Sequence, residues 1–282
     1  MIVVHTPAVQ VSPGAGRSAV SRLGGVLCGF DERNAHPISR TEPSSAWAKI
    51  VVLFAGALRL RSGRVDVSAS GGPAAFVLPA GAGPIHTHQE AGATACLEVV
   101  VPPWAVLKLF GRPITEDIVE WSSLSPGIVT ELLDRLCAAT DWDQRFALTD
   151  DIVERSARLS RFMPRREILH AWRRMNDANG MVSVRALAQE IGWSERYFAD
   201  RFRADMGLLP KAAAQQLRFD HARRCVVQST TSLALLAAQC GYADQSHMTR
   251  DFSELAGAAP AMIRKAGQPD LIGAIPETGV IR

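Results

Sequence analysis

The stretch "VSVRALAQEIGWSERYFADRFRADMGLLP" spans Val182 to Pro210, and "TSLALLAAQCGYADQSHMTRDFSELAGAAP" spans Thr231 to Pro260. Both begin with a Ser near a Leu-Ala pair, continue through a Gly, and place large apolar residues four positions apart before a Gly and a Pro. After one extra residue, Ala243, the second copy runs 50 residues behind the first. Such self-similarity indicates a duplicated structural unit.

Each copy has the pattern of a helix-turn-helix. A capping residue opens a short helix, a glycine permits a tight turn, and a second capped helix follows. Large apolar residues at positions i and i+4 pack this second helix on the first, which turns its opposite face outward. The equivalent pairs are Ser183 and Ser232 at the first cap, Gly192 and Gly241 at the turn, and Ser194 and Asp244 at the second cap.

The outward faces of the two second helices carry side chains that suit the major groove of DNA. Gln and Arg make bidentate contacts to base edges, Asp accepts from cytosine, and Ala or the Thr methyl contacts a thymine methyl. A solvated surface would explain either face alone, but the duplication favours nucleic-acid binding. The predicted reading residues are Glu195, Arg196, Ala199, Asp200 and Arg203 in the first copy and Gln245, Ser246, Thr249 and Arg250 in the second.

The segment between the copies predicts one long helix. Pro210 stands at its start, and no helix breaker follows up to Gln228. A helix of this length extends about 28 Å, close to the roughly 34 Å of one DNA turn, so the two reading helices can enter successive major grooves. Ser183 and Ser232 are placed to hold phosphates, although a role as caps alone is equally compatible.

The duplicated pattern, with "GYADQSHMTRDFSELAGAAP" in its second copy, resembles the DNA-binding domain of the AraC/XylS transcription regulators over about residues 165–266. Asp200 departs from the pattern, because many relatives with a "GWS" start carry Arg there. This departure indicates either a cytosine contact or a weaker first half-site. The resemblance implies DNA-reading positions at Arg196 and its neighbours in the first unit, and at Gln245, Ser246, Thr249 and Arg250 in the second.

The preceding half predicts a β-rich domain. Leu58 and Leu60 alternate with arginines, and "CLEVVVPP" places Leu97, Val99 and Val101 on one face. Gly, Pro and Ser clusters separate such runs, which favours an antiparallel sandwich or small barrel. This half is similar, more loosely, to the effector domains that precede the DNA-binding domain in the AraC/XylS family, and we expect a cupin-like fold.

The fold class predicted for the whole chain is α+β multidomain. We assign residues 1–103 to a β-rich cupin-like effector domain, 104–164 to a helical extension, 165–266 to an all-α domain of two helix-turn-helix units joined by a long helix, and 267–282 to a tail. In the extension, "SPGIVTELLDRLCAA" has Ser125 as a cap and an apolar stripe. The stripe, formed by Ile128, Leu132 and Leu136, covers its own domain or forms a dimer seam.

Other patterns in the sequence favour no chemistry. "HTH" at residues 86–88, with Glu90 and Glu98 downstream, suggests a metal cupin, but the β part supplies no further His, so ordinary loop histidines are the better interpretation. Neither a G-x-S-x-G elbow nor a phosphate-binding glycine loop occurs in a suitable setting. Cys225 and Cys240 are expected in the core rather than as redox sensors. The sequence therefore predicts no metal, no cofactor and no catalytic residue.

Bulk properties agree with a globular DNA-binding protein. Hydrophobic residues make up 47% and charged residues 21% of the 282-residue chain. Residues 165–282 carry a formal charge of +4, against −1 for residues 1–164, and this places the basic excess in the region of the duplication. The five cysteines form no CxxC pair. Neither a signal peptide nor a membrane-spanning run is predicted, which favours a cytoplasmic location.

We therefore expect a transcription regulator, more often an activator in the resembled family, that binds double-stranded promoter DNA. RNA polymerase, a small-molecule effector and a second copy of the chain are the other partners considered. Two alternatives stay open. One is a cupin-type metalloenzyme with an appended DNA-binding domain, and the other is a helical module whose duplicated units bind another protein.

Overall fold

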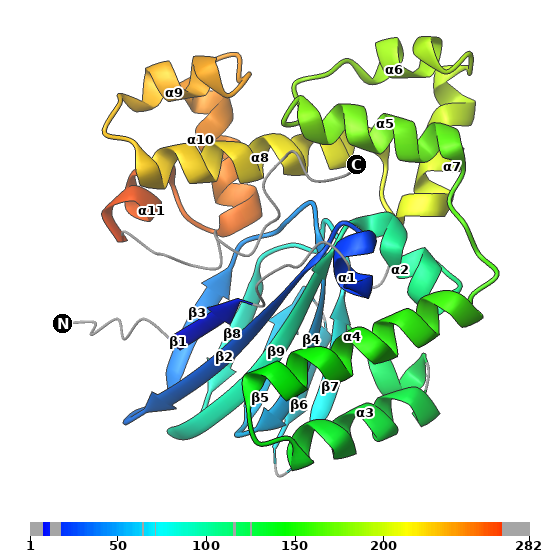
Figure 1. Cartoon of the computed structure of the whole chain (residues 1–282). Helices are drawn as coiled ribbons and strands as arrows, with labels where there is room; N and C mark the ends of the chain where they lie inside the picture. The colour runs from blue at the N-terminus through cyan, green and yellow to red at the C-terminus, as the bar shows by residue number, and fades with distance from the viewer. Residues whose placement is uncertain are drawn as a thin grey trace.

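The computed structural model describes residues 8–11, 18–63, 65–70, 72–114, 117–124 and 126–266. A β-rich half built from the first part of the chain lies below a helical half built from the last part (Figure 1). The long helix α8, Pro210–Gln228, runs across the top of the β-rich half and joins the two groups of helices. The α+β class and the order of the two halves predicted from the sequence are confirmed.

Two antiparallel sheets form the β-rich half. The six-stranded sheet has the order β1 (Ala8–Val11), β2 (Val26–Asn34), β9 (Gly92–Val101), β4 (Ala48–Ala55), β7 (Ala74–Leu78) and β10 (Val119–Glu120). The four-stranded sheet has the order β3 (Ile38–Glu42), β8 (Ile85–Gln89), β5 (Leu58–Ser62) and β6 (Val65–Ala69). Apolar side chains from both sheets share one core between them, as in a sandwich.

Strand β9 is buried on both faces, and its alternation separates two cores. Leu97, Val99 and Val101 belong to the core under the covering helices, as predicted, whereas Cys96 and Val100 belong to the core between the sheets. In β5, Leu58 and Leu60 are buried while the intervening arginines are exposed, so the predicted alternation there is also confirmed.

Helices cover the outer face of the six-stranded sheet (Figure 1). They are α1 (Ala19–Arg22), α2 (Pro103–Phe110), α3 (Pro126–Ala138) and α4 (Trp142–Leu159), with a short 3-10 turn at Trp121–Ser123. Leu132 and Leu136 of α3 are fully buried in the core beneath these helices. Leu132 and Leu136 therefore cover their own domain, the first of the two alternatives. The predicted cap Ser125 lies outside the described residues.

A charged cluster of buried Glu98 and half-buried Glu42 and Lys49 lies between the sheets, at β3, β4 and β9. Lys49 Nζ lies 2.8 Å from Glu42 Oε2 and 3.8 Å from Glu98 Oε2. Glu98 Oε2 has no hydrogen-bond partner among the described residues. Desolvation is the largest cause that raises the pKa of Glu98, to about 7, although Lys49 opposes the shift. Glu42 thus forms the close ion pair with Lys49. Glu98 is the surplus carboxyl of the cluster, in the sense that it has no close ion-pair partner of its own.

Glu98→Gln is expected to stabilise the protein at pH 8 by about 1–3 kcal/mol. The pKa of Glu98 in the folded chain lies above its ordinary value of 4.5, so ionisation costs more in the folded than in the unfolded state. The wild type should therefore lose stability as the pH rises from about 4.5 to about 7. Urea unfolding at pH 5 and pH 8 measures this difference, with the exposed Glu90→Gln as control. An identical pH dependence in Glu98→Gln and wild type would contradict the assignment.

The helical half contains two three-helix groups around α8. The first comprises α5 (Arg166–Asp177), α6 (Val184–Glu190) and α7 (Glu195–Met206), and the second comprises α9 (Leu233–Gln239), α10 (Gln245–Ala256) and α11 (Pro260–Ala266). The predicted helix between the copies has the expected limits, Pro210 and Gln228. The first group shares its core with the sandwich, whereas the second has a core of its own.

The loop between β3 and β4 joins the two halves of the molecule. The Ser44 N–H donates to the Leu255 carbonyl oxygen of α10 at 2.7 Å. Asp220 of α8 accepts from the Ala46 N–H at 3.0 Å and from the Ser45 hydroxyl at 3.2 Å. One loop therefore contacts the linking helix and the second unit together. Desolvation raises the pKa of the buried Asp220 carboxyl, opposed first by Arg223.

Candidate nucleic-acid interface

The caps of both helix-turn-helix units are formed as predicted. The Ser183 and Ser232 hydroxyls accept from backbone N–H groups at 3.2 and 3.3 Å and open α6 and α9. The second helices begin in the same way, at Ser194 for α7 and at Asp244 for α10. Each cap satisfies a backbone donor that has no partner within its helix, so the local sequence determines where all four helices start.

The turn of each unit depends on a left-handed glycine. Gly192 has a φ of 73° and Gly241 a φ of 75°, a region that side chains other than that of Gly rarely adopt. The Gly241 N–H donates to the Ala238 carbonyl oxygen at 3.2 Å. These glycines set the angle at which each second helix leaves the first.

Gly241→Val is expected to lower the free energy of unfolding by about 2 kcal/mol, because a β-branched residue is strained at positive φ. A Cβ at Gly241 would also approach Met181 Cγ at 2.7 Å, although this flexible side chain can move. Gly192→Val is the matched variant, since a Cβ there meets nothing within 4 Å. Calorimetry should show similar losses in both variants. A melting temperature equal to that of the wild type would contradict the role of the turn.

Large apolar residues fix the second helices, as the spacing predicted. Phe198 and Phe202 of α7 are fully buried, with ring centroids 5.6 Å apart. Met248 and Phe252 of α10 are fully buried, and the ring centroids of Phe252 and Phe219 of α8 lie 5.0 Å apart. The second unit is thereby packed directly on the linking helix.

The predicted reading residues lie on the side of α7 and α10 away from these cores. Ala199 and Thr249 are half-buried, and the remaining side chains are exposed. Exposure is required of a residue that reads base edges. The exposed residues are Glu195, Arg196, Asp200 and Arg203 on α7 and Gln245, Ser246 and Arg250 on α10.

Interactions within the protein leave the basic reading residues available. Arg196, Arg203 and Arg250 form no ion pair with any residue that the structure describes. Glu195, in contrast, forms an ion pair with Arg185 of α6, with 3.6 Å between Glu195 Oε1 and Arg185 Nε. The Thr249 hydroxyl donates to the Gln245 carbonyl oxygen at 2.9 Å. This bond uses the hydroxyl hydrogen, so the methyl group is the part of the side chain considered for contact with a base.

Tyr197 is a surface residue that the sequence analysis did not single out. Its side chain is 45% exposed beside Arg196. The ring contacts Trp193 with centroids 4.9 Å apart, and the Arg201 guanidinium lies 5.0 Å from the ring centroid. A large aromatic residue one position before a buried Phe was the available signal, since both cannot face the core of one helix.

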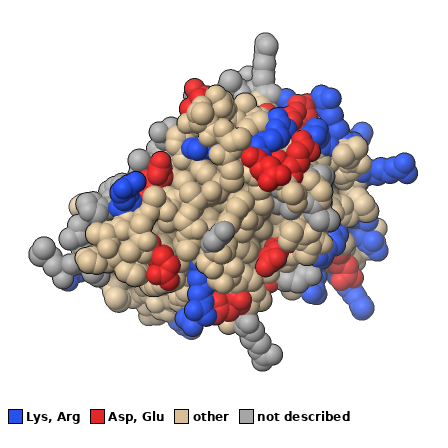
Figure 2. Space-filling view, turned by 90° about the horizontal axis from the view of Figure 1, so that it is seen from below, with Lys and Arg blue, Asp and Glu red and all other residues tan. Residues whose placement is uncertain are grey.

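The opposite end of the molecule has a surface of mixed charge. Figure 2 views the molecule from below and shows acidic and basic side chains side by side. In α3, at the lower end of the molecule in Figure 1, Glu131 pairs with Arg155 at 2.8 Å and with Arg135 at 3.3 Å. Such alternation of sign gives little attraction for a phosphate backbone.

His86 and His88 were interpreted as loop histidines, and this was wrong because they lie in strand β8. Their Nδ1 atoms contact the Thr41 hydroxyl at 3.0 Å and the Ser39 hydroxyl at 2.8 Å. The neighbouring residues of β8 are buried, so the histidines project from the outer face of the sandwich. Glu98 lies in the other sheet and is buried, which separates it from these histidines.

No helix within the described part of the chain is long and apolar enough to cross a membrane.

Comparison with known proteins identifies the C-terminal region. Residues 187–266 match the family described as "Helix-turn-helix domain". The chain is also 30% identical over 89 residues to the "HTH-type transcriptional regulator Rv1931c" of Mycobacterium tuberculosis. This alignment covers 32% of the present chain and 34% of that relative, so it spans about a third of the relative's length.

Solved structures share the fold of most of the chain. ToxT from Vibrio cholerae O395 aligns with a TM-score of 0.51 and 8% identity over 87% of this chain and 98% of that chain. Wild-type ToxT with a bound unsaturated fatty acid aligns with a TM-score of 0.50 and 10% identity, covering 84% and 94% of the two chains. At such identities the likeness establishes the fold alone. The predicted arrangement, a β-rich domain followed by a double helix-turn-helix, is thereby confirmed.

Proposed function

Because residues 187–266 match a helix-turn-helix domain family, we propose that the protein is an AraC-type transcription regulator that binds specific sequences in double-stranded DNA. The duplication carries this proposal. Each unit has a capped second helix with an apolar face in the core and a polar face in solvent. The continuous helix α8 joins the units and sets the spacing at which two helices meet one duplex.

In the second unit, Gln245 and Arg250 read base edges. Both side chains have the donors and acceptors for bidentate contacts with adenine or guanine. Ser246 adds a hydroxyl that suits either a base or a phosphate, and Thr249 offers its methyl group to thymine. The Ser232 hydroxyl accepts from a backbone N–H, so its own hydrogen is free to donate to a phosphate oxygen.

In the first unit, Arg196 and Arg203 supply positive charge to the DNA, and Ala199 offers a small apolar contact. Asp200 is exposed between them, and its carboxylate either accepts from cytosine or weakens this half-site. Ser183 is the counterpart of Ser232 for phosphate contact. The two units therefore read different sequences with different strengths.

The N-terminal domain receives the regulatory signal, from a small-molecule effector or from a partner such as RNA polymerase or a second copy of the chain. The ToxT fold, solved with an unsaturated fatty acid, supports a small molecule. Ser44 and Asp220 connect the β-rich half to the second unit and to α8. A ligand that favours one docking of the two halves changes DNA affinity by population shift. Activation rather than repression is the proposed outcome.

The proposed functional units have the boundaries that we expect from the sequence. Residues 1–103 receive the signal, 104–164 support that domain, and 165–266 bind DNA. The protein acts in the cytoplasm and catalyses no reaction. The metalloenzyme alternative loses support because His86 and His88 project away from the interior that holds Glu98.

In-vitro selection of random duplex DNA by the purified full chain, at two salt concentrations, tests the proposal. Enrichment of two short blocks about one helical turn apart is the expected result. One block alone would indicate that the first unit only clamps the backbone. The protein-binding alternative would be favoured if the chain bound DNA with no sequence preference, with or without added cell extract. The salt dependence of its DNA affinity would then be that of nonspecific binding.

A further inference from the structure

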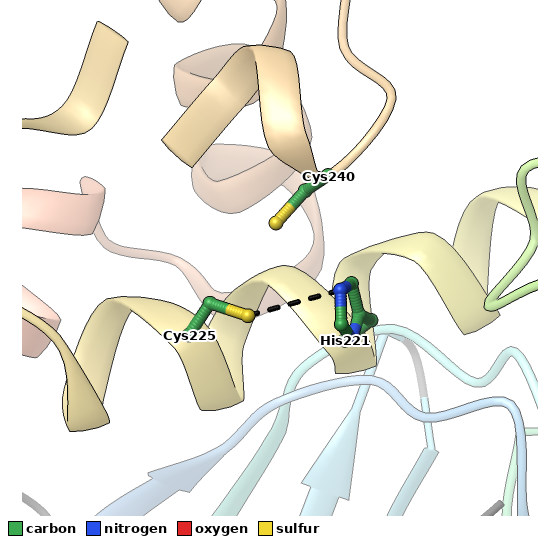
Figure 3. Close-up of side chains that lie close together, drawn as sticks. All are labelled: His221, Cys225 and Cys240. Atoms are coloured by element: carbon green, nitrogen blue, oxygen red, sulfur yellow. Dashed lines mark hydrogen bonds between the residues drawn. The ribbon is translucent and has the colours of Figure 1, made fainter. Parts of the chain in front are cut away.

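Three side chains with soft or nitrogen donor atoms meet where α8 packs on α9. His221 and Cys225 come from α8, and Cys240 comes from the end of α9. Cys225 Sγ lies 3.8 Å from His221 Nε2. The ligand atoms of all three residues lie within 4.8 Å of one another. Figure 3 shows the three side chains converging on the space between the two helices.

The fold itself holds these positions. His221 and Cys225 stand four residues apart, so they share one face of α8. The Cys240 N–H donates to the Leu236 carbonyl oxygen at 2.9 Å, and this bond fixes the end of α9. Cys240 is 1% exposed in the core of the second unit, whereas His221 and Cys225 are half-buried. The cluster is thus anchored on its inner side and accessible on its outer side.

The donor set and its spacing match a thiophilic metal ion. Two thiolates and one imidazole are ligands that Zn²⁺ prefers, and Zn²⁺ imposes little geometry of its own. Tetrahedral zinc places its ligand atoms about 3.5–3.8 Å apart. The 3.8 Å between Cys225 and His221 already has this value, and the upper limit of 4.8 Å needs a displacement of about 1 Å or less per side chain.

We propose that His221, Cys225 and Cys240 bind one Zn²⁺ ion, and that the ion ties α9 to α8. Three protein ligands leave the fourth position of zinc to a water molecule or another small ligand. The ion joins the long helix to the first helix of the second helix-turn-helix, one residue before Gly241. This role adds to the cap and the glycine turn, which orient the helix that follows.

Protonation states in the metal-free protein agree with binding that releases protons. Desolvation, followed by the charge of Arg224, lowers the pKa of His221, so its imidazole is neutral at pH 7 with a lone pair free for metal. Desolvation and the neighbouring Cys225 raise the pKa of Cys240 to about 12. Cys240 therefore begins as a thiol. A thiol that binds zinc releases its proton to solvent, and no electron is transferred.

Zinc titration of the reduced, metal-free full chain tests the site. One equivalent should bind at pH 7.5 with a rise of several degrees in melting temperature. Co²⁺ in place of Zn²⁺ should give the absorption bands of a cobalt thiolate. His221→Asn and Cys225→Ser alter half-buried ligands, and each should weaken zinc binding by at least about 100-fold. Cys137→Ser is the control, because this exposed cysteine lies outside the cluster.

A Cys240→Ser variant alone would not test the site, because substitution of this buried residue can destabilise the domain even without zinc. The two half-buried variants keep the test independent of that effect. Equal zinc affinity in wild type, His221→Asn and Cys225→Ser would overturn the proposal, as would the absence of stoichiometric binding. A Cys225–Cys240 disulfide in the protein as isolated, with no zinc uptake after reduction, would also overturn it and indicate a redox pair instead.

Discussion

Trp172→Ala should lower the free energy of unfolding by about 3–5 kcal/mol. Trp172 is fully buried in α5, and its ring meets Trp47 of the β-rich half edge-on, with centroids 6.0 Å apart. Its Nε1 has no hydrogen-bond partner among the described residues. The loss therefore comes from packing, through the removed apolar contacts and the cavity that remains. Equilibrium urea unfolding measures this change.

The same experiment tests whether the two halves share a core. A double-mutant cycle with Trp47→Ala and Trp172→Ala should give a coupling energy of about 0.5–1.5 kcal/mol, the usual contribution of an aromatic pair. Phe162→Ala is the control, because Phe162 is 53% exposed and should change stability little. Additive effects of the two tryptophan variants would contradict the docking of the first unit on the sandwich.

Gln245→Ala combined with Arg250→Ala should abolish most of the discrimination between selected and random DNA. Each base contact contributes about 1–3 kcal/mol, so the double variant should lose at least about 30-fold in specificity. The fold should be preserved, because both side chains are exposed and leave the Met248 and Phe252 packing intact. Competition binding of the full chain at two salt concentrations separates the contributions.

Arg158→Ala provides the matched charge control. Its side chain is 77% exposed on α4, outside the helix-turn-helix units, and its removal lowers the net charge by the same amount as Arg250→Ala. It should change nonspecific affinity slightly and specificity not at all. If the α10 double variant kept the specificity of the wild type, α10 would not be the reading helix.

Sequence patterns were sufficient where structure depends on near neighbours. The caps Ser183, Ser194, Ser232 and Asp244 and the left-handed glycines of the turns could all be predicted, because a cap or turn is satisfied within a few residues. The i, i+4 spacing of Phe198 and Phe202 likewise identified the buried face of α7. The same caps, turn glycines and apolar spacing recur about 50 residues later, and this repetition predicted the architecture of the DNA-binding domain.

Sequence patterns were insufficient where partners are distant in the chain. Placing His86 and His88 in loops was wrong, because the signal of the short strand β8 is weak beside the glycines that precede it. Cys225 and Cys240 were expected in the core, and Cys240 is buried there, but Cys225 is half-buried beside His221. Cys240 follows Cys225 by 15 positions and His221 by 19, so no local spacing reveals the cluster.

What the sequence alone determined is the duplicated helix-turn-helix and the residues that face away from its cores, because helical periodicity and capping act over a few residues. Tertiary structure alone decided that the loop holding Ser44 and Ala46 reaches both α8 and α10, that Glu98 is the surplus carboxyl beside Lys49, and that one core unites the first unit with the sandwich. Each of these depends on how two folded surfaces dock and exclude water, which brings together residues whose sequence separation carries no periodic signal.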